Sequence, residues 1–462
     1  MIRFFNVYYQ TRTLVLLVCE VLLVAGSFLL AIFLLSSAQF VGPDLAIVLI
    51  YEDGLLKIAG ITILTVLLTY YFDLYEQRRI NEKSEVYFRL LLVLGCLSFF
   101  LAGLVYFLPD LDIGPHVLVF GLSILAVFLM LWRWAYSWLI GLEMFRERVY
   151  VLGSGERARA VVETVKANRS SGMEIVGWKG EISAADSIGG MVADLRAFRG
   201  DKPGIDRIIV AMEDRRQAMP VRELLDLRLR GVVIENSSPL VERLSGKLPL
   251  DGLNPSMLIF AEGFKMNTTH MLLRRLLSIS VSLVASLICL PFVPFIILAV
   301  RLSSPGPILF SQTRVGRRGK LFTAYKFRTM RQDAEANGAV WAVKDDPRVT
   351  RVGMIMRKTR LDEIPQLWNV LRGDMAFVGP RPERPEFVQW LSQEIPYYDL
   401  RHMIRPGITG WAQVRYQYGA SLEETKRKLE YDLYYVKHQT IGLDLLIMFE
   451  TIKTIILRRG AQ

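Results

Sequence analysis

The chain has 462 residues, of which 52% are hydrophobic, and it carries a formal net charge of +11. This length allows two or three domains, and so large an apolar share is unusual for a soluble enzyme. Apolar segments together with excess Lys and Arg favour a membrane protein that meets anionic lipid or an anionic substrate, and they disfavour nucleic acid as the partner.

Four apolar stretches in residues 1–145 are long enough to cross a bilayer. They cover about 14–38, 47–72, 87–108 and 116–140. The N-terminus and the segments YEQRRINEK and MFRERVY are basic, whereas the loops QFVGPDLA and PDLDIGPH carry acids and no Lys or Arg. The positive-inside rule therefore predicts a four-helix transmembrane bundle with both ends in the cytoplasm.

Residues 146–262 alternate short β-rich runs with helical ones, which is typical of an α/β, Rossmann-like cytoplasmic module. RVYVLGSGERARAVVETV predicts a strand, a glycine turn and a helix, and MEIVGWKG, DRIIVAME and GVVIEN predict further strands. Gly153, Gly155 and Ala158 fit the G-x-G-x-x-A turn of a dinucleotide site. VGWKG, however, stands where the acidic residue of such a site is expected. A module that binds no cofactor is therefore favoured over a dinucleotide-binding one.

A fifth apolar run, about 271–300, is interrupted by Pro291 and Pro294. Each proline removes an amide donor and clashes with the preceding turn, so we expect the membrane helix to break at Pro291. Arginines flank both ends of the run. Because both ends favour the cytoplasm, a re-entrant helix is favoured over a kinked span.

The stretch KTRLDEIPQLWNVLRG places two adjacent carboxylates, Asp362 and Glu363, before a short predicted helix. Pro365 fits the first position of that helix and Gly373 its end. Amide groups and the dipole at a helix N-terminus stabilise anions. A solvated charge cluster is the ordinary explanation of such a pair, but many cations surround it in the sequence. They are Arg314, Lys326, Arg328, Arg357, Lys358, Arg360, Arg372, Arg381 and Arg384.

This combination contains the parts that phosphoryl transfer requires. A carboxylate among so many cations is expected to keep a low pKa and stay ionised, which suits a nucleophile. Arginine forks bind phosphate oxygens. A second carboxylate can hold Mg²⁺, which shares oxygen ligands with substrate phosphates. The spacing alone thus predicts phosphate chemistry at a membrane face.

The motifs around these residues resemble those of the polyprenyl-phosphate phosphoglycosyl transferases of the monotopic superfamily. They read SPGPILFSQTRVGRRGKLFTAYKFRTM, DPRVTRVGMIMRKTRLDEIPQLWNVLRGDMAFVGPRPERPEF and RPGITGWAQVRY, and the similarity covers about 265–462 in the same order. With the regions before it, the chain resembles the long-chain initiating sugar transferases of exopolysaccharide and O-antigen assembly. The opening FFNVYYQTRTL resembles a subgroup linked to exosortase (PEP-CTERM) clusters. The resemblance implies an α/β-mixed catalytic domain, residues 265–462, on a re-entrant helix.

The resemblance also implies a reaction at the bacterial inner membrane: transfer of a sugar 1-phosphate from a UDP-sugar to undecaprenyl phosphate, with release of UMP. By motif position, Asp362 attacks the β-phosphorus and forms a covalent phosphosugar ester, and Glu363 is the expected Mg²⁺ ligand. Phosphates are expected to bind Arg357, Arg381, Lys326, Arg328 and Arg314. The family often has Ser where this chain has Leu290 before Pro291; this departure concerns the exact bend, for which Pro294 can compensate, and not the re-entrant topology.

Two other functions stay open at this point. A nucleotide-sugar dehydratase or epimerase built on the Rossmann-like module would need a Tyr-x-x-x-Lys pair, which the chain lacks. A non-catalytic membrane scaffold or sensor is disfavoured by the intact carboxylate pair. Glucose or galactose 1-phosphate is the expected sugar, with N-acetylated sugars as alternatives, and the Rossmann-like module is expected to regulate activity or to mediate formation of a homodimer.

Near the C-terminus, SLEETKRKLEYDLYYVKH and GLDLLIMFETIKTIIL predict amphipathic helices that lie in the membrane interface or pack on the domain. Tyr434 and Tyr435 are expected to anchor a helix at the interface. For Trp411, a core position is favoured over stacking on uracil.

Overall fold

The structure is a computed structural model. It describes residues 2–4, 7–9, 11–37, 53–75, 83–141, 146–168, 171–178, 193–195, 198, 204–212, 219–250, 253, 255–260, 263–264, 267–332, 334, 346–416 and 421–456. The chain forms two compact units, which consist mainly of residues 8–240 and 241–462. Each unit is described by itself.

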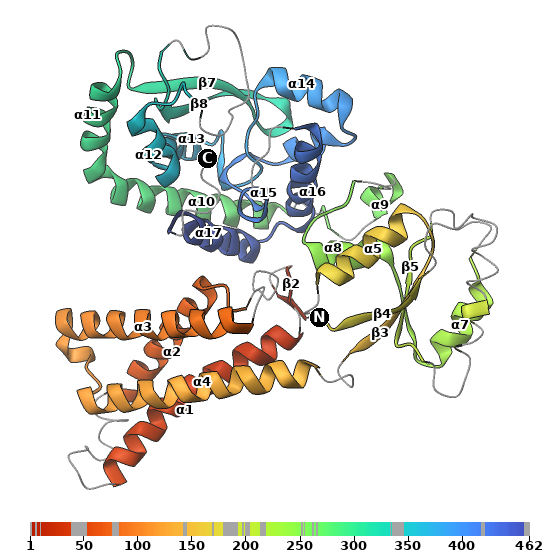
Figure 1. The fold of residues 1–462 in the computed structure, drawn as a ribbon. Helices are drawn as coiled ribbons and strands as arrows, with labels where there is room; N and C mark the ends of the chain where they lie inside the picture. The colour runs from red at the N-terminus through yellow and green to blue at the C-terminus, as the bar shows by residue number, and fades with distance from the viewer. Residues whose placement is uncertain are drawn as a thin grey trace. The chain divides into compact units, whose positions relative to one another are not determined.

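Four long apolar helices dominate the N-terminal part of the first unit (Figure 1). After two short strands, β1 (Ile2–Phe4) and β2 (Val7–Tyr9), they are α1 (Thr11–Ser37), α2 (Gly54–Tyr71), α3 (Lys83–Phe107) and α4 (Pro115–Gly141), with a 3-10 turn η3 (Pro109–Leu111) before α4. Each of the four is long and apolar enough to cross a membrane. The expected start of the second run, at 47, falls in 38–52, outside the described residues. One core joins all four helices and includes Phe28, Ile58, Leu97 and Leu125.

A buried ion pair joins α1 to α4. The Nε atom of Arg133 lies 2.6 Å from Oε1 of Glu20, and the Tyr75 hydroxyl donates to the other Glu20 oxygen at 2.6 Å. Arg133 also donates to the carbonyl oxygen of Leu74 at 2.8 Å. Because an unpaired charge is costly among apolar helices, these contacts restrict how the helices pack.

The rest of the first unit is built around a four-stranded parallel sheet. Its strands are β3 (Glu147–Leu152), β4 (Met173–Trp178), β5 (Arg207–Val210) and β6 (Val233–Asn236), in the order β4-β3-β5-β6. Helices α5 (Glu156–Ala167) and α7 (Val221–Leu229) lie between strands in the chain. These elements lie where the alternation of the sequence predicts them.

The glycine turn after β3 has a packing explanation. Gly153 has a φ of 149°, and a Cβ atom there would lie 2.6 Å from the carbonyl carbon of Ala211, just after β5. Glycine is therefore required where the ends of two neighbouring strands approach closely, whether or not a ligand binds.

The second unit contains the fifth apolar segment, Thr268–Ser303. It runs as α10 (Thr268–Cys289), a 3-10 turn η6 (Leu290–Phe292) and α11 (Val293–Ser303). The break at Pro291 is as predicted, and Figure 1 shows α10 and α11 running in different directions.

The remaining elements of the second unit form a mixed α/β arrangement. A β-hairpin of β7 (Leu309–Val315) and β8 (Leu321–Phe327) is antiparallel, and β9 (Ala376–Val378) pairs in parallel with β10 (Gly407–Thr409). The helices and 3-10 turns are α8 (Ser237–Ser245), which begins just before the unit, α9 (Pro255–Phe260), η7 (Arg317–Gly319), α12 (Arg351–Thr359), η8 (Leu361–Glu363), α13 (Gln366–Arg372), α14 (Pro385–Glu394), η9 (Tyr398–Met403), α15 (Trp411–Arg415), α16 (Leu422–His438) and α17 (Ile441–Ile456).

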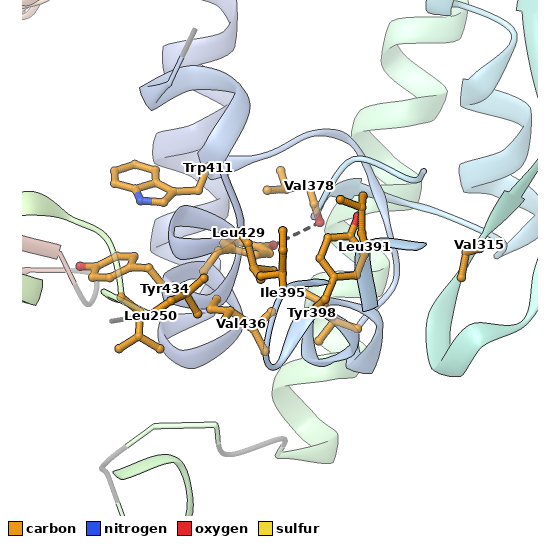
Figure 2. Close-up of a cluster of buried hydrophobic side chains, with 14 of the residues drawn as sticks. Leu250, Val315, Val378, Leu391, Ile395, Tyr398, Trp411, Leu429, Tyr434 and Val436 are labelled. Atoms are coloured by element: carbon orange, nitrogen blue, oxygen red, sulfur yellow. Dashed lines mark hydrogen bonds between the residues drawn. The ribbon is translucent and has the colours of Figure 1, made fainter. Parts of the chain in front are cut away.

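The apolar core of this unit contains the aromatic residues of α15 and α16 (Figure 2). Trp411 is only 2% exposed. Its indole donates to the carbonyl oxygen of Gly246 at 2.7 Å and stacks on Tyr434, so the core position favoured for Trp411 is confirmed. Tyr434 and Tyr435 are each 1% exposed, which makes the predicted interfacial anchoring wrong. Their rings pack inward because α16 is a core helix, and the Tyr435 hydroxyl donates within this core to Asp444 at 2.6 Å.

Residues before α10 also belong to this core. Leu248 and Leu250 are buried in it, and the Leu248 amide donates to the Glu430 carbonyl oxygen at 2.9 Å. In α8, the Glu242 carboxylate lies 2.7 Å from both the Lys437 ammonium and the His438 ring. The compact unit thus begins at Val241, ahead of the expected domain start at residue 265.

Candidate active site

Two left-handed residues shape the segment that carries the acidic pair. Helix α12 ends because Arg360 takes a φ of 60°. The chain then forms η8, and α13 starts directly after Pro365 and ends at Gly373, which has a φ of 101°. The predicted end at Gly373 is confirmed, whereas Pro365 immediately precedes α13 and is not its first residue. Asp362 and Glu363 lie in the tight turn that leads into α13.

Asn369 fixes α13 on the hairpin, and sequence reasoning missed it. It is fully buried. Its amide donates to the Thr323 carbonyl oxygen at 2.7 Å and accepts from the Tyr325 amide at 3.2 Å, both in β8. These two bonds hold the acidic turn beside Lys326, the next residue of the same strand. A buried asparagine that satisfies strand groups has no distinct signal in a single sequence.

Glu363 is the carboxylate that the cations contact. Its Oε1 atom lies 2.9 Å from Nζ of Lys326, 3.0 Å from Nη1 of Arg381 and 3.8 Å from Nη1 of Arg360. Burial opposes ionisation of this group, but Lys326, Arg381 and Arg360 outweigh burial and hold the pKa of Glu363 well below its ordinary value. Glu363 is therefore ionised and fixes the cations that flank the site.

Asp362 lies in different surroundings from its neighbour. It is 7% exposed, and its buried Oδ1 atom has no hydrogen-bond partner in the described part of the chain. Burial raises the pKa of Asp362 above its ordinary value, and the charges of Lys326, Arg381 and Arg357 oppose this rise without cancelling it. The expected low pKa thus holds for Glu363 and is wrong for Asp362, because the close ion pairs are made by Glu363. Asp362 has a basic oxygen that a reacting group could approach.

The predicted phosphate-binding residues fall into two groups: three lie at the acidic pair, and two bind main-chain oxygens elsewhere. Lys326 and Arg381 lie at Glu363, and the charge of Arg357 acts on Asp362. Arg328 and Arg314 instead support turns. Arg328 donates to the Ser304 carbonyl oxygen at 2.6 Å, at the end of α11. Arg314 donates to the Pro382 carbonyl oxygen at 3.0 Å, beside Arg381.

A buried arginine that sequence reasoning missed supports the Arg381 loop. Arg401, 3% exposed, donates to the Arg381 carbonyl oxygen at 2.9 Å and to Asp432 at 2.8 Å. It also donates to the Tyr398 hydroxyl at 2.6 Å. Arg401 therefore connects the α16 core to the loop that carries a cation of the site.

His402, next to Arg401, is expected to make stability pH-dependent. Burial first, and then the charge of Arg401, lower the pKa of His402 from 6.5 to about 4. Between these values the unfolded chain binds a proton that the folded chain excludes, so stability falls as pH falls from 6.5 towards 4. Melting temperatures in detergent across this window measure the effect. His402→Gln should flatten the dependence and His270→Gln, at an exposed position, should not; an unchanged slope in His402→Gln would contradict the assignment.

The acidic pair fits the expected magnesium ion by the chemistry of its donors. Mg²⁺ takes oxygen ligands, commonly one or two carboxylates together with substrate phosphates. Asp362 Oδ1 is a buried carboxylate oxygen to which no group in the described ranges donates a hydrogen bond. Glu363, the neighbouring carboxylate, is ionised and adds a second set of oxygen donors. The described residues contain no cluster of three or more His, Cys, Asp or Glu that could hold a metal.

Comparison with known proteins assigns the second unit. Residues 269–458 match the family model described as bacterial sugar transferase. The chain is 44% identical over 188 residues to the exopolysaccharide production protein PSS of Rhizobium leguminosarum bv. phaseoli, and the match covers 39% of this chain and 94% of that protein. The chain belongs to the bacterial sugar transferase family. The resemblance seen in its motifs is confirmed at this level.

Two further relatives are longer than the Rhizobium leguminosarum protein. A UDP-N-acetylgalactosamine-undecaprenyl-phosphate N-acetylgalactosaminephosphotransferase of Aeromonas hydrophila is 40% identical over 241 residues, which are 52% of this chain and 56% of the relative. An undecaprenyl-phosphate glucose phosphotransferase of Komagataeibacter xylinus is 33% identical over 323 residues, 68% of this chain and 60% of the relative. The chain therefore spans less than two thirds of the length of either protein.

Proposed function

We propose that this sugar transferase moves a sugar 1-phosphate from a UDP-sugar to undecaprenyl phosphate, releasing UMP, as a membrane step of exopolysaccharide biosynthesis. The observation that carries the proposal is Asp362. Its buried Oδ1 has no hydrogen-bond partner among the described residues, and it lies beside a second carboxylate that Lys326 and Arg381 contact. The names of the relatives, which include undecaprenyl-phosphate sugar phosphotransferases and an exopolysaccharide production protein, support the same reaction.

In the first step, an oxygen of Asp362 attacks the β-phosphorus of the UDP-sugar. The bond from that phosphorus to the bridging oxygen breaks, the oxygen leaves with UMP, and an aspartyl phosphosugar ester forms. Lys326, Arg381 and Arg357 stabilise the charge on the phosphate oxygens. The raised pKa of Asp362 makes its carboxylate a stronger nucleophile than an ordinary surface aspartate.

In the second step, a phosphate oxygen of the polyprenyl phosphate attacks the phosphorus of the ester. The bond to Asp362 breaks, the carboxylate is regenerated, and a polyprenyl diphosphate sugar is formed. A bound Mg²⁺, held by Asp362 or Glu363, would neutralise phosphate charge. Glu363 stays ionised throughout and keeps Lys326 and Arg381 in position.

The membrane arrangement is part of the proposal. The four helices of the first unit cross the bacterial inner membrane, and α10 and α11 enter and leave it on the cytoplasmic side. The interrupted helix at Pro291 and the basic flanks of the segment support this arrangement. Donor and acceptor phosphates then meet at one membrane face.

The first test is UMP release by purified protein with Mg²⁺ and undecaprenyl phosphate, measured over a panel of UDP-sugars. One sugar should be strongly preferred. Glucose, galactose and N-acetylgalactosamine belong in the panel, since the relatives are named for glucose and N-acetylgalactosamine. Multiple-turnover release that requires the lipid acceptor would support the proposal, because without acceptor each protein molecule can release only one UMP. If folded protein releases no UMP from any UDP-sugar of a broad panel, a non-catalytic scaffold is favoured instead.

A further inference from the structure

A cavity lined by arginines lies on one face of α10, away from the acidic pair. Met271, Arg274, Arg275 and Ser278 supply one wall, at the spacing of a single helix face. Arg317 and Arg405 lie among the residues of the other wall, and the space between the walls is small and open to solvent. We call Arg274, Arg275, Arg317 and Arg405 with this space the arginine cavity.

Within the described residues, three of the four arginines have no acidic partner. Arg274 is paired with Asp444, at 2.7 Å. The other three donate to main-chain oxygens: Arg275 to Val370 at 2.6 Å, Arg405 to Gly373 at 3.1 Å and Arg317 to Met403 at 3.4 Å. Among the residues that the structure describes, no carboxylate lies within ion-pair distance of these three side chains.

The charges of the arginine cavity repel one another. Burial lowers the pKa of Arg405, and the nearby positive charges of Arg275 and Arg317 lower it further. Guanidinium groups that converge without a counter-charge are stabilised by a bound anion, and their planar forks suit phosphate oxygens. The cavity therefore has the chemistry of a phosphate site.

Two helices in contact with the arginines of the cavity, α10 and α13, also carry exposed apolar side chains. The apolar segment that begins at Thr268 includes exposed Leu272, Leu276 and Leu283, on faces of α10 other than the one that lines the cavity. Trp368 of α13 is 61% exposed, and exposed tryptophan is typical of membrane–water interfaces. A phosphate that carries acyl chains would satisfy both the arginines and this apolar surface.

We propose that the arginine cavity binds the headgroup phosphate of an anionic membrane phospholipid. This phosphate is not the reacting one. Arg275 contacts the carbonyl oxygens of Val370 and Leu371 at the C-terminal end of α13, whereas Asp362 and Glu363 precede its N-terminal end. A helix of seven residues separates the two ends by roughly 10 Å. The inference does not depend on the proposed reaction.

The test uses the full-length chain in detergent. Phosphatidylglycerol, phosphatidylcholine, inorganic phosphate or undecaprenyl phosphate is titrated, and bound lipid is counted by native mass spectrometry. Phosphatidylglycerol should bind most tightly, and Arg317→Gln should weaken it about tenfold, the usual effect of losing one charge-assisted hydrogen bond. Arg318→Gln is the matched control, because the neighbouring Arg318 is exposed and does not line the cavity.

Other outcomes would overturn the proposal. Equal binding by Arg317→Gln and wild type, or no preference over phosphatidylcholine, would show that the arginine cavity does not select an anionic lipid. Full displacement by millimolar inorganic phosphate would identify a site for free anions. Preferential displacement by undecaprenyl phosphate would assign the cavity to the acceptor. Unchanged melting temperatures of both variants without lipid exclude a folding defect, and Arg405→Gln provides a second variant.

Discussion

Replacing Asp362 by Asn is expected to reduce UMP release at least about a thousandfold, because an amide cannot serve as the attacking oxygen. The fold should survive, since Asp362 makes no ion pair in the described part of the chain and Asn is nearly the same size. Initial rates of UMP release with the preferred UDP-sugar measure the loss. Asp374→Asn, near the other end of α13, is the matched control and should retain most of the activity.

The same variant tests the covalent step directly. Wild-type protein given UDP-sugar without acceptor should gain the mass of a phosphosugar, and Asp362→Asn should not. Glu363→Gln is also expected to lose activity, but for a different reason: it keeps the nucleophile and removes the charge that positions Lys326 and Arg381. If Asp362→Asn keeps more than about a tenth of the wild-type rate, Asp362 is not the nucleophile.

Replacing Arg401 by Met is expected to destabilise the second unit by about 3–5 kcal/mol, because the substitution leaves the buried Asp432 without its cation. Arg401 and Asp432 are 3% and 2% exposed and lie 2.8 Å apart. The loop of Arg381 would lose a hydrogen bond as well. Thermal unfolding in detergent, followed by tryptophan fluorescence, measures the change.

Two further variants separate charge burial from the loss of packing. In Arg401→Met with Asp432→Leu, both charges are gone and a large part of the stability should return. Arg427→Met removes an exposed arginine of α16 that faces Glu423 at 3.6 Å, and it should change stability by about 0.5 kcal/mol or less. If Arg401→Met behaved like Arg427→Met, the buried pair would have no structural role.

The parts of the fold that depend on local pattern could be predicted from the sequence. The lengths of the apolar runs predicted the long apolar helices, the alternation predicted the parallel strands, and Pro291 predicted the break between α10 and α11. Each follows from neighbours in the chain, so no tertiary information is needed.

The side chains whose place depends on tertiary packing were harder to predict. Arg328 is two residues from Lys326, but β8 ends at Phe327, so the chain turns and Arg328 reaches α11 instead of the acidic pair. Asp362 and Glu363 are neighbours in the sequence, and the sequence alone likewise does not reveal which of the two carboxylates the cations contact. Tyr434 and Tyr435 were misplaced because an amphipathic helix against a core and one against a membrane have similar patterns.

The docking of residues 241–250 on the α16 core affects how such chains can be recombined. Leu248 and Leu250 complete the same core as Trp411, and Glu242 is bound by Lys437. A fusion point at residue 265 would separate these residues from their partners, whereas a fusion point just before Val241 keeps them together. An N-terminal domain can therefore be removed or exchanged without damage to this core only if residues 241–250 stay attached to the catalytic unit.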